Sequence, residues 1–174
     1  MNALLLAAAL LGSGQGLVPF AGRVVAITDG DTLTVLDGEN RQHRLRLAEI
    51  DAPERGQPFG TAARARLAGL VFGERVEFLV HSIDRYGREV ATVRKPGGAP
   101  GADTVNLEMV RSGYAWAYTG YAKDPRTRLA EAEARSAGSG LWSGPAPVPP
   151  WEWRRAKKQP GPEKRRSARV SKVG

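Results

Sequence analysis

Cysteine is absent from this chain of 174 residues, and so is a hydrophobic run long enough to cross a bilayer. Without cysteine the protein has no disulfide and no thiolate metal ligand, so any metal site needs ligands of another kind. The apolar run at residues 3–11 has only nine members, whereas a membrane-spanning helix needs about 20.

Charged side chains are absent from the first 22 residues. The apolar run has the length of a signal-peptide core, and the "GSGQG" that follows supplies the small residues a signal peptidase accepts. No Lys or Arg precedes the run, although a signal peptide usually has a positively charged residue there. We expect residues 1–21 to be a cleaved export signal; an uncleaved anchor, or a leader from a misassigned start, would explain the same pattern.

Most of the chain carries almost no net charge. Residues 1–150 hold 17 Lys and Arg against 16 Asp and Glu, whereas residues 151–174 hold nine against two. The overall charge of +8 therefore belongs almost entirely to the C-terminal tail. Any attraction of the body of the protein for a polyanion must come from local clusters of charge.

Alternating and β-branched residues predict five strands, at residues 23–27, 32–36, 41–47, 74–80 and 88–95. The Asp37-Gly38 pair predicts a hairpin between the second and third strands. Pro53 marks the end of the third strand. Five short strands of this kind favour a small barrel over a sandwich.

Three helices are predicted, at residues 61–73, 104–113 and 124–140. Gly73 and Gly113 are expected to stop the first two, and Asp124 and Pro125 to begin the third. One helix thus lies between strands three and four and two follow strand five, in a mainly β, α+β domain spanning residues 22–143. Residues 144–174 are proline-rich and then basic; we expect the tryptophans of "PPWEWRR" to clamp onto the body, with disorder beyond about residue 156.

Charged residues that suggest chemistry gather in three short clusters at strand ends and turns. Asp31 and Asp51, with the backbone carbonyl of Ala52, would supply half of the oxygen shell that a hard cation such as Ca²⁺ requires. Asp and Gly are also common turn residues, so the segment 29–32, taken alone, is more readily explained as a simple turn.

Two arginines and a glutamate complete these clusters. Arg46 and Arg88 present planar forks of donors suited to phosphate oxygens, although arginines near acids are more often surface ion pairs. Glu54 is a candidate general base that activates water, or else an ordinary exposed acid. Strict strand alternation would point Arg46 and Asp51 to opposite faces. Both can reach one site only if the strand bulges or ends near Glu49.

The motifs "DGDT" at residues 29–32, "R-x4-D-x-P-E" from Arg46 to Glu54, and "D-[KR]-Y-G-R" at residues 84–88 together resemble those of the staphylococcal nuclease family. The resemblance covers residues 22–143. It implies a five-stranded OB-fold barrel with three helices. It also implies a Ca²⁺-dependent enzyme that cleaves DNA and RNA and leaves 3′-phosphate products.

The resemblance also implies a role for each matching residue. Asp31, Asp51 and the Ala52 carbonyl would bind Ca²⁺, with Asp29 behind them. Arg46, Arg88 and Glu54 would be catalytic, and Tyr86 and Tyr121 would line the nucleotide pocket. The chain departs from the staphylococcal enzyme in having Ala52 where that enzyme has threonine, and in a shorter loop after Glu54.

Further expectations concern partners and location. The ending "LWSGPAPVPPWEWRR" resembles those of exported bacterial members, which implies a periplasmic or secreted protein. We expect a monomer that acts on DNA and RNA, with no membrane association once the signal is cleaved. The basic tail would add nonspecific nucleic-acid contacts, or else be solvated without a role. The alternative function is a non-catalytic OB-fold module that binds single-stranded nucleic acid.

Overall fold

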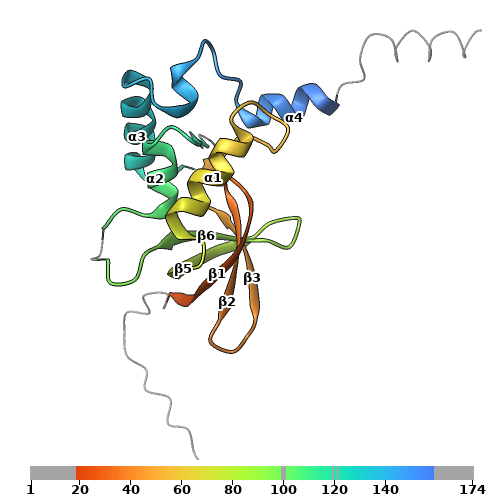
Figure 1. Ribbon diagram of the computed structural model, residues 1–174, viewed down its shortest axis with the longest axis vertical. Coiled ribbons are helices and arrows are strands. Elements are labelled where there is room, and N and C mark those ends of the chain that lie inside the picture. The colour runs from red at the N-terminus through yellow and green to blue at the C-terminus, as the bar shows by residue number, and fades with distance from the viewer. Residues whose placement is uncertain (1–18, 99–100, 119, 121, 159–174) are drawn as a thin grey trace, which may run out of the picture.

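The computed structural model describes residues 19–98, 101–118, 120 and 122–158 (Figure 1). Most of the expected export signal, the basic end of the tail and Tyr121 lie outside the described residues. Among the described residues, no helix is both long enough and apolar enough to cross a membrane.

Five strands close into a barrel in the order β1-β2-β3-β6-β5. The pairs are antiparallel except that β3 runs parallel to β6. The five strands therefore confirm the predicted small barrel, which has the strand number and closure of an OB fold. Their bounds are β1 Phe20–Asp29, β2 Thr32–Asp37, β3 Gln42–Leu47, β5 Arg75–Ile83 and β6 Glu89–Arg94.

The barrel core is built by alternate residues of each strand, as the two-residue period of a half-buried strand requires. Leu33 and Val35 on β2 and Leu45 and Leu47 on β3 have no exposed surface. The predicted β2–β3 hairpin is present, but its left-handed residue is Asn40, with φ of 60°, rather than the glycine of the Asp-Gly pair.

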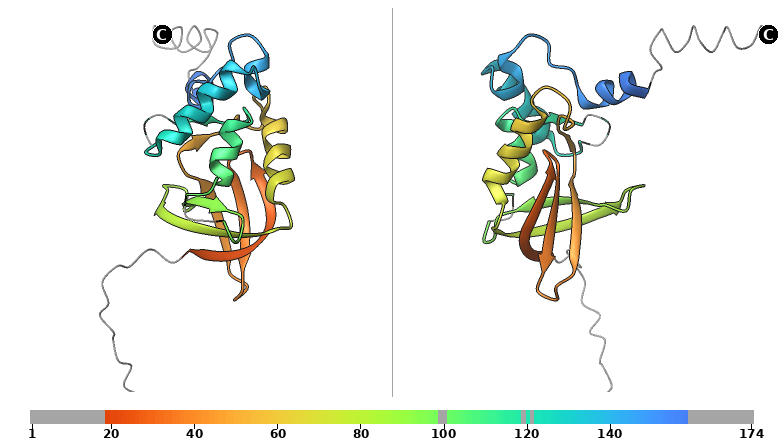
Figure 2. Two further views of the ribbon diagram at one scale, coloured as in Figure 1. Left: turned by 90° about the vertical axis from the view of Figure 1, so that its left-hand side faces the viewer. Right: turned by 45° about the vertical axis from the view of Figure 1, so that its right-hand side comes forward.

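All three predicted helices are present. Helix α1 (Gly60–Val71), α2 (Val105–Arg111) and α3 (Pro125–Ser136) gather at one end of the barrel (Figure 2). Asp124 caps α3 as predicted, because its side chain accepts a hydrogen bond from the backbone N–H of Arg126. Gly73 and Gly113 follow α1 and α2 with φ of 79° and 76°, as expected of helix-ending glycines.

Several short elements were not predicted. Strands β4 (Ile50–Asp51) and β7 (Trp116–Ala117) form a separate two-stranded sheet, and a 3₁₀ turn spans Gly140–Ser143. A fourth helix, α4, spans Pro150–Lys158. The residues after it, for which disorder was expected, lie outside the described residues. Helix α4 lies apart from α3, beside the loop that precedes α1 (Figure 1).

A buried amide joins the helices to the strand that carries the candidate site. Asn106, at the start of α2, is only 6% exposed. Its Oδ1 accepts from the backbone N–H of Val93 at 3.0 Å, and its Nδ2 donates to the carbonyls of Ala48 at 3.0 Å and Ala91 at 3.1 Å. This side chain therefore fixes α2 against β6 and against the segment that follows β3.

Replacing Asn106 with alanine is expected to lower the free energy of unfolding by about 2–4 kcal/mol, because it leaves buried backbone groups of Val93 and Ala48 without these partners. Urea unfolding measures the change. The control Arg128→Ala removes an exposed side chain from α3 and should change stability by less than about 0.5 kcal/mol. A loss below about 1 kcal/mol for the Asn106 variant would show that the amide is not a structural tie.

Candidate active site

One cleft beside the barrel, with a volume of about 810 Å³, is lined by every predicted site residue that the structure describes. Tyr121, the remaining predicted site residue, lies outside the described residues. Three clusters far apart in the sequence thus converge on a single cavity. The predicted residues that line it are Asp29, Asp31, Arg46, Asp51, Ala52, Glu54, Tyr86 and Arg88.

Arg46 and Asp51 reach the same side because β3 ends early. The strand stops at Leu47, Glu49 adopts a left-handed conformation with φ of 65°, and the chain resumes at Ile50 as β4. Arg46 Nη2 then donates to Asp51 Oδ1 at 3.1 Å. The predicted break near Glu49 is therefore confirmed.

Contacts with later parts of the chain hold Glu49 in its unfavourable conformation. Its carbonyl accepts from the backbone N–H of Tyr118 at 2.8 Å. Its carboxylate accepts from the backbone N–H of Asp124 at 3.1 Å and the hydroxyl of Thr127 at 3.4 Å, at the N-terminus of α3. A carboxylate is favoured there by the positive end of the helix dipole. These bonds compensate for the strain of a non-glycine residue in the left-handed region.

Two buried aspartates form the centre of the cleft. Asp31 is 8% exposed and Asp51 1% exposed. Arg46 Nη2 lies 3.5 Å from Asp31 Oδ2 as well as bonding Asp51, so one guanidinium spans both carboxylates. Burial, opposed by a hydrogen bond from Arg154 and reinforced by the charge of Asp31, raises the pKa of Asp51. Such a pair of desolvated acids is stabilised by nearby positive charge.

The backbone around Asp31 is packed too closely to admit a larger residue than glycine next to it. A Cβ on Gly30 would lie 2.7 Å from the Ala63 side chain and 2.9 Å from that of Ala52. The Ala52 methyl is thus used in packing, while its backbone N–H points at Asp31 Oδ2 from 3.5 Å. The residue at this position is therefore alanine rather than threonine, and its backbone lies beside the acids.

Asp29 lies at the edge of the acidic pair. Burial and the charge of Asp31 raise the pKa of Asp29, and Arg55 Nε lies 3.9 Å from its carboxylate. Asp29 therefore adds negative charge to the cleft without bonding Asp31 directly.

Arg88 is held in place by the turn that precedes it. Its guanidinium donates to Asp84 Oδ2 from Nε at 2.8 Å, and its Nη1 donates to the hydroxyl of Thr32 at 3.2 Å. That hydroxyl donates in turn to Asp31 Oδ1 at 2.8 Å. Although burial opposes it, hydrogen bonding from Arg88 and Tyr86 lowers the pKa of Asp84. Arg88 is therefore fixed by an ionised acid and linked to Asp31.

Glu54 occupies a tight turn between β4 and α1. Its backbone N–H donates to Gln57 Oε1 at 3.1 Å, and the Gln57 N–H donates back to the Glu54 carbonyl at 2.8 Å. A Cβ on Gly60 would lie 2.1 Å from that carbonyl, so only glycine allows this approach. The Glu54 side chain remains 40% exposed, within reach of water.

Two aromatic residues line the cleft. Tyr86 is 63% exposed and lies beneath the guanidinium of Arg88, 5.5 Å from ring centroid to Cζ. Tyr118 was not predicted; its ring lies 5.9 Å from the Arg46 Cζ.

Arg154 on α4 was also not predicted as a site residue. Its Nη2 lies 2.7 Å from Asp51 Oδ2, and its Nη1 donates to Glu54 Oε1 at 2.6 Å. The helix is anchored by Trp151, whose ring stacks on Tyr118 at 5.6 Å, as expected of the tryptophans of "PPWEWRR". The paired tryptophans were the available signal, but no local pattern identifies which arginine would reach the acids.

The donor set fits a hard cation bound partly by backbone and water. No three His, Cys, Asp or Glu side chains converge on a common point within the described part of the chain. The candidate ligands, two carboxylates and the Ala52 carbonyl, are all oxygen atoms, which suit Ca²⁺ with its preference for mixed carboxylate, carbonyl and water ligands. The cluster is unsuited to metals that require nitrogen or sulfur ligands.

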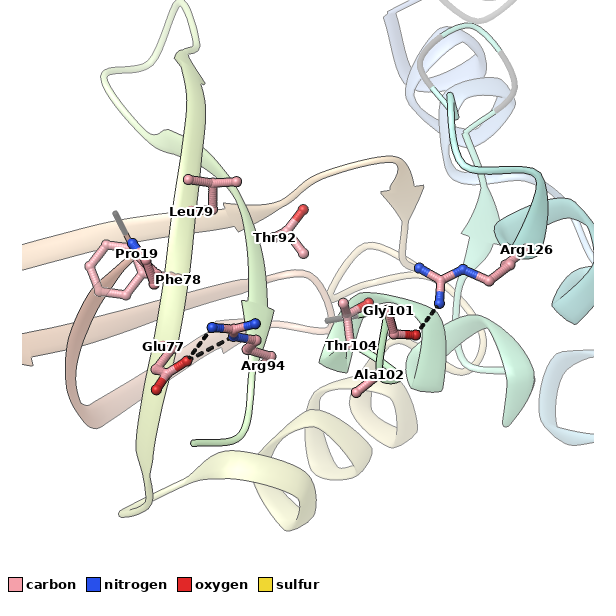
Figure 3. Close-up of a pocket in the computed structure, with 10 residues that line it drawn as sticks. All are labelled: Pro19, Glu77, Phe78, Leu79, Thr92, Arg94, Gly101, Ala102, Thr104 and Arg126. Atoms are coloured by element: carbon pink, nitrogen blue, oxygen red, sulfur yellow. Dashed lines mark hydrogen bonds and ion pairs between the residues drawn. The ribbon is translucent and has the colours of Figure 1, made fainter. Parts of the chain in front are cut away.

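A second, smaller hollow of about 210 Å³ has no comparable chemistry (Figure 3). Its charged groups are already satisfied: Arg94 pairs with Glu77 at 2.7 Å, and Arg126 donates to the carbonyl of Gly101 at 2.6 Å. The acidic cleft is therefore the stronger candidate for a site of reaction.

Sequence comparisons identify the family of the chain. The family model described as "Staphylococcal nuclease homologue" matches residues 44–144. A "Micrococcal nuclease" of Shigella flexneri is 46% identical over 165 residues, covering 91% of this chain and 94% of the relative. An "Uncharacterized endonuclease" of Haemophilus influenzae is 43% identical over a match that covers 78% of this chain and 74% of the relative. The chain belongs to the staphylococcal nuclease family.

The two glycines of α1 predict opposite effects of the same substitution. Gly60→Ala places a methyl group against the Glu54 carbonyl, so it should shift the Glu54 turn and destabilise the fold by about 1–3 kcal/mol. Gly69→Ala, where nothing lies within 4 Å of the added atom, should stabilise the exposed helix by about 0.5–1 kcal/mol. Thermal unfolding of both variants tests this, and equal shifts in Tm would contradict it.

Proposed function

We propose that this protein is a calcium-dependent nuclease that hydrolyses phosphodiester bonds of DNA and RNA and leaves 3′-phosphate products. The observation that carries the proposal is the pair of buried aspartates flanked by Arg46 and Arg88 in one open cleft. Relatives named as a micrococcal nuclease and as endonucleases support the reaction class.

Asp31, Asp51 and the carbonyl of Ala52 are the residues proposed to hold the cation. Bound there, Ca²⁺ would act as a Lewis acid on a phosphate oxygen and neutralise charge that develops on it. The burial of Asp51 supports this role, because an ionised carboxylate with so little access to water is best stabilised by a cation.

Arg46 and Arg88 are proposed to bind the phosphate and stabilise its extra negative charge in the transition state. Both side chains are already ordered by acids, Arg46 by the aspartate pair and Arg88 by Asp84. Donors fixed in advance need little reorganisation when charge develops on the substrate, which is the main source of electrostatic catalysis.

Glu54 is proposed to accept a proton from the attacking water. Its carboxylate is partly exposed, whereas Asp51 beside it is buried. Two neighbouring acids in different environments are suited to different roles, here a cation ligand and a base. Tyr86, exposed at the mouth of the cleft, is proposed to stack against a base of the substrate.

The test is digestion of single-stranded DNA and of RNA with added Ca²⁺ and again with a chelator. We expect cleavage of both substrates with Ca²⁺ and its loss on chelation, with 3′-phosphate ends in the products. Equal cleavage in both conditions would refute calcium dependence. Tight binding of single strands with no turnover would favour the non-catalytic binding module instead.

Substituting the arginines should separate catalysis from binding. Arg88→Lys retains the charge but loses the planar fork, and we expect kcat to fall about 10²- to 10³-fold, with less effect on KM. Arg46→Lys should behave similarly. The control Arg75→Ala removes an exposed positive charge at the start of β5, away from the cleft, and should leave kcat within about twofold. A fall in affinity alone would indicate that these arginines only bind substrate.

A further inference from the structure

The proposed reaction assigns no role to Arg154, which contacts both Asp51 and Glu54. This arginine lies on α4, about 100 residues beyond the two acids it contacts. Its two terminal nitrogens donate to Asp51, at 2.7 and 3.3 Å, and one of them also donates to Glu54 at 2.6 Å. A single side chain therefore bridges the proposed cation ligand and the proposed base.

Asp51 has both carboxylate oxygens engaged by guanidinium groups. Oδ2 accepts from Arg154, and Oδ1 accepts from Arg154 and from Arg46. A carboxylate bound in this way has little capacity left for a divalent cation, which needs a lone pair and unscreened negative charge. Glu54 Oε1 is likewise occupied by the Arg154 guanidinium, so that oxygen is not free to accept a hydrogen bond from water.

The helix that supplies Arg154 is held by few contacts. Of its nine residues only Pro150 is buried. Apart from the ion pairs of Arg154, the segment is held by the stack of Trp151 on Tyr118 and by the hydrogen bond from Gln57 Nε2 to the Val148 carbonyl at 2.5 Å. The indole nitrogen of Trp153 is also buried. Segments with little buried surface open at low free-energy cost. Helix α4 is therefore able to release the cleft without disturbing the barrel.

We propose that Arg154 is an internal competitor of the divalent cation, delivered by α4 to Asp51 and Glu54. The inference rests on the proposed calcium site. With Arg154 seated, its guanidinium offsets part of the negative charge of Asp51 and Glu54. When Arg154 leaves, the oxygens of Asp51 that it occupied become free for the metal, and Glu54 Oε1 becomes free for water. The helix thereby sets the calcium concentration at which the site becomes competent.

The charges around the acids support competition between Arg154 and the divalent cation. Asp31, Asp51 and Glu54 carry three negative charges, and Arg46 and Arg154 carry two positive charges in direct contact with them. Removing Arg154 doubles the excess negative charge of this group from one to two. Attraction for a divalent cation in a partly buried site must rise accordingly.

The experiment is calcium binding to the full chain, measured by isothermal titration calorimetry with CaCl₂ and no nucleic acid. We expect Arg154→Ala to bind Ca²⁺ at least about tenfold more tightly than the wild type, because it removes the competing charge. Arg154→Lys, which keeps the charge but not the fork, should be intermediate. The matched control is Arg155→Ala, which removes the same charge from an exposed neighbour without a contact to the acids, and should change affinity less than about twofold.

Unchanged or weaker calcium binding by Arg154→Ala, alongside normal binding by the wild type, would overturn the inference and leave the proposed nuclease function standing. Absence of calcium binding by the wild type and by all variants would overturn both. Weakened binding in particular would mean that Arg154 helps to position Asp51 and Glu54.

The proposed competition can also be measured at α4, because coupling between two binding events is reciprocal. If Arg154 opposes the cation, Ca²⁺ must oppose the docking of α4 by the same factor. Backbone hydrogen exchange of residues 150–158 in the wild type should therefore become faster on adding CaCl₂, and in Arg154→Ala it should already be fast and insensitive to calcium. Unchanged or slower exchange in the wild type would overturn the inference.

Discussion

The left-handed turn at Glu49 is the constraint on which the site depends. A regular strand would send Arg46 and Asp51 to opposite faces, and the turn instead brings them within 3.1 Å. The cost of this conformation is met by bonds from Tyr118 and from the start of α3, both far along the chain. The start of α3 and the segment before it therefore do more than cover the barrel, because they stabilise a backbone irregularity that brings Arg46 and Asp51 together.

Electrostatic balance explains why the charged residues are so heavily paired. Burying Asp51 costs free energy unless positive charge is close, and Arg46 supplies it while lying within 3.5 Å of Asp31. Arg88 is fixed in the same way by Asp84 and joined to Asp31 through Thr32. Each arginine thus stabilises the fold in the resting state and points its donors toward the cleft.

Sequence reasoning succeeded where local patterns carry the information. Alternation predicts the five strands, and the Asp124 cap and the stop at Gly113 predict helix ends, because each depends on neighbouring residues. The break near Glu49 was predictable only by requiring Arg46 and Asp51 to share a site. Strands β4 and β7 have two residues each, too few for any period to be seen. Helix α4 was missed because its proline-rich, basic surroundings have the composition of a disordered tail.

The position of Arg154 outside the barrel has a physical logic of its own. The groups proposed to bind the phosphate and the cation, Arg46 and the aspartates, lie on strands or at their ends, where packing fixes them. A cation that must leave before another can bind is better placed on an element whose docking is weak, since its departure then costs little. The stack of Trp151 on Tyr118 seats the helix beside the cleft, and only Pro150 of its nine residues is buried. The weak docking of the helix that carries Arg154 therefore fits the proposed competition between this arginine and the metal.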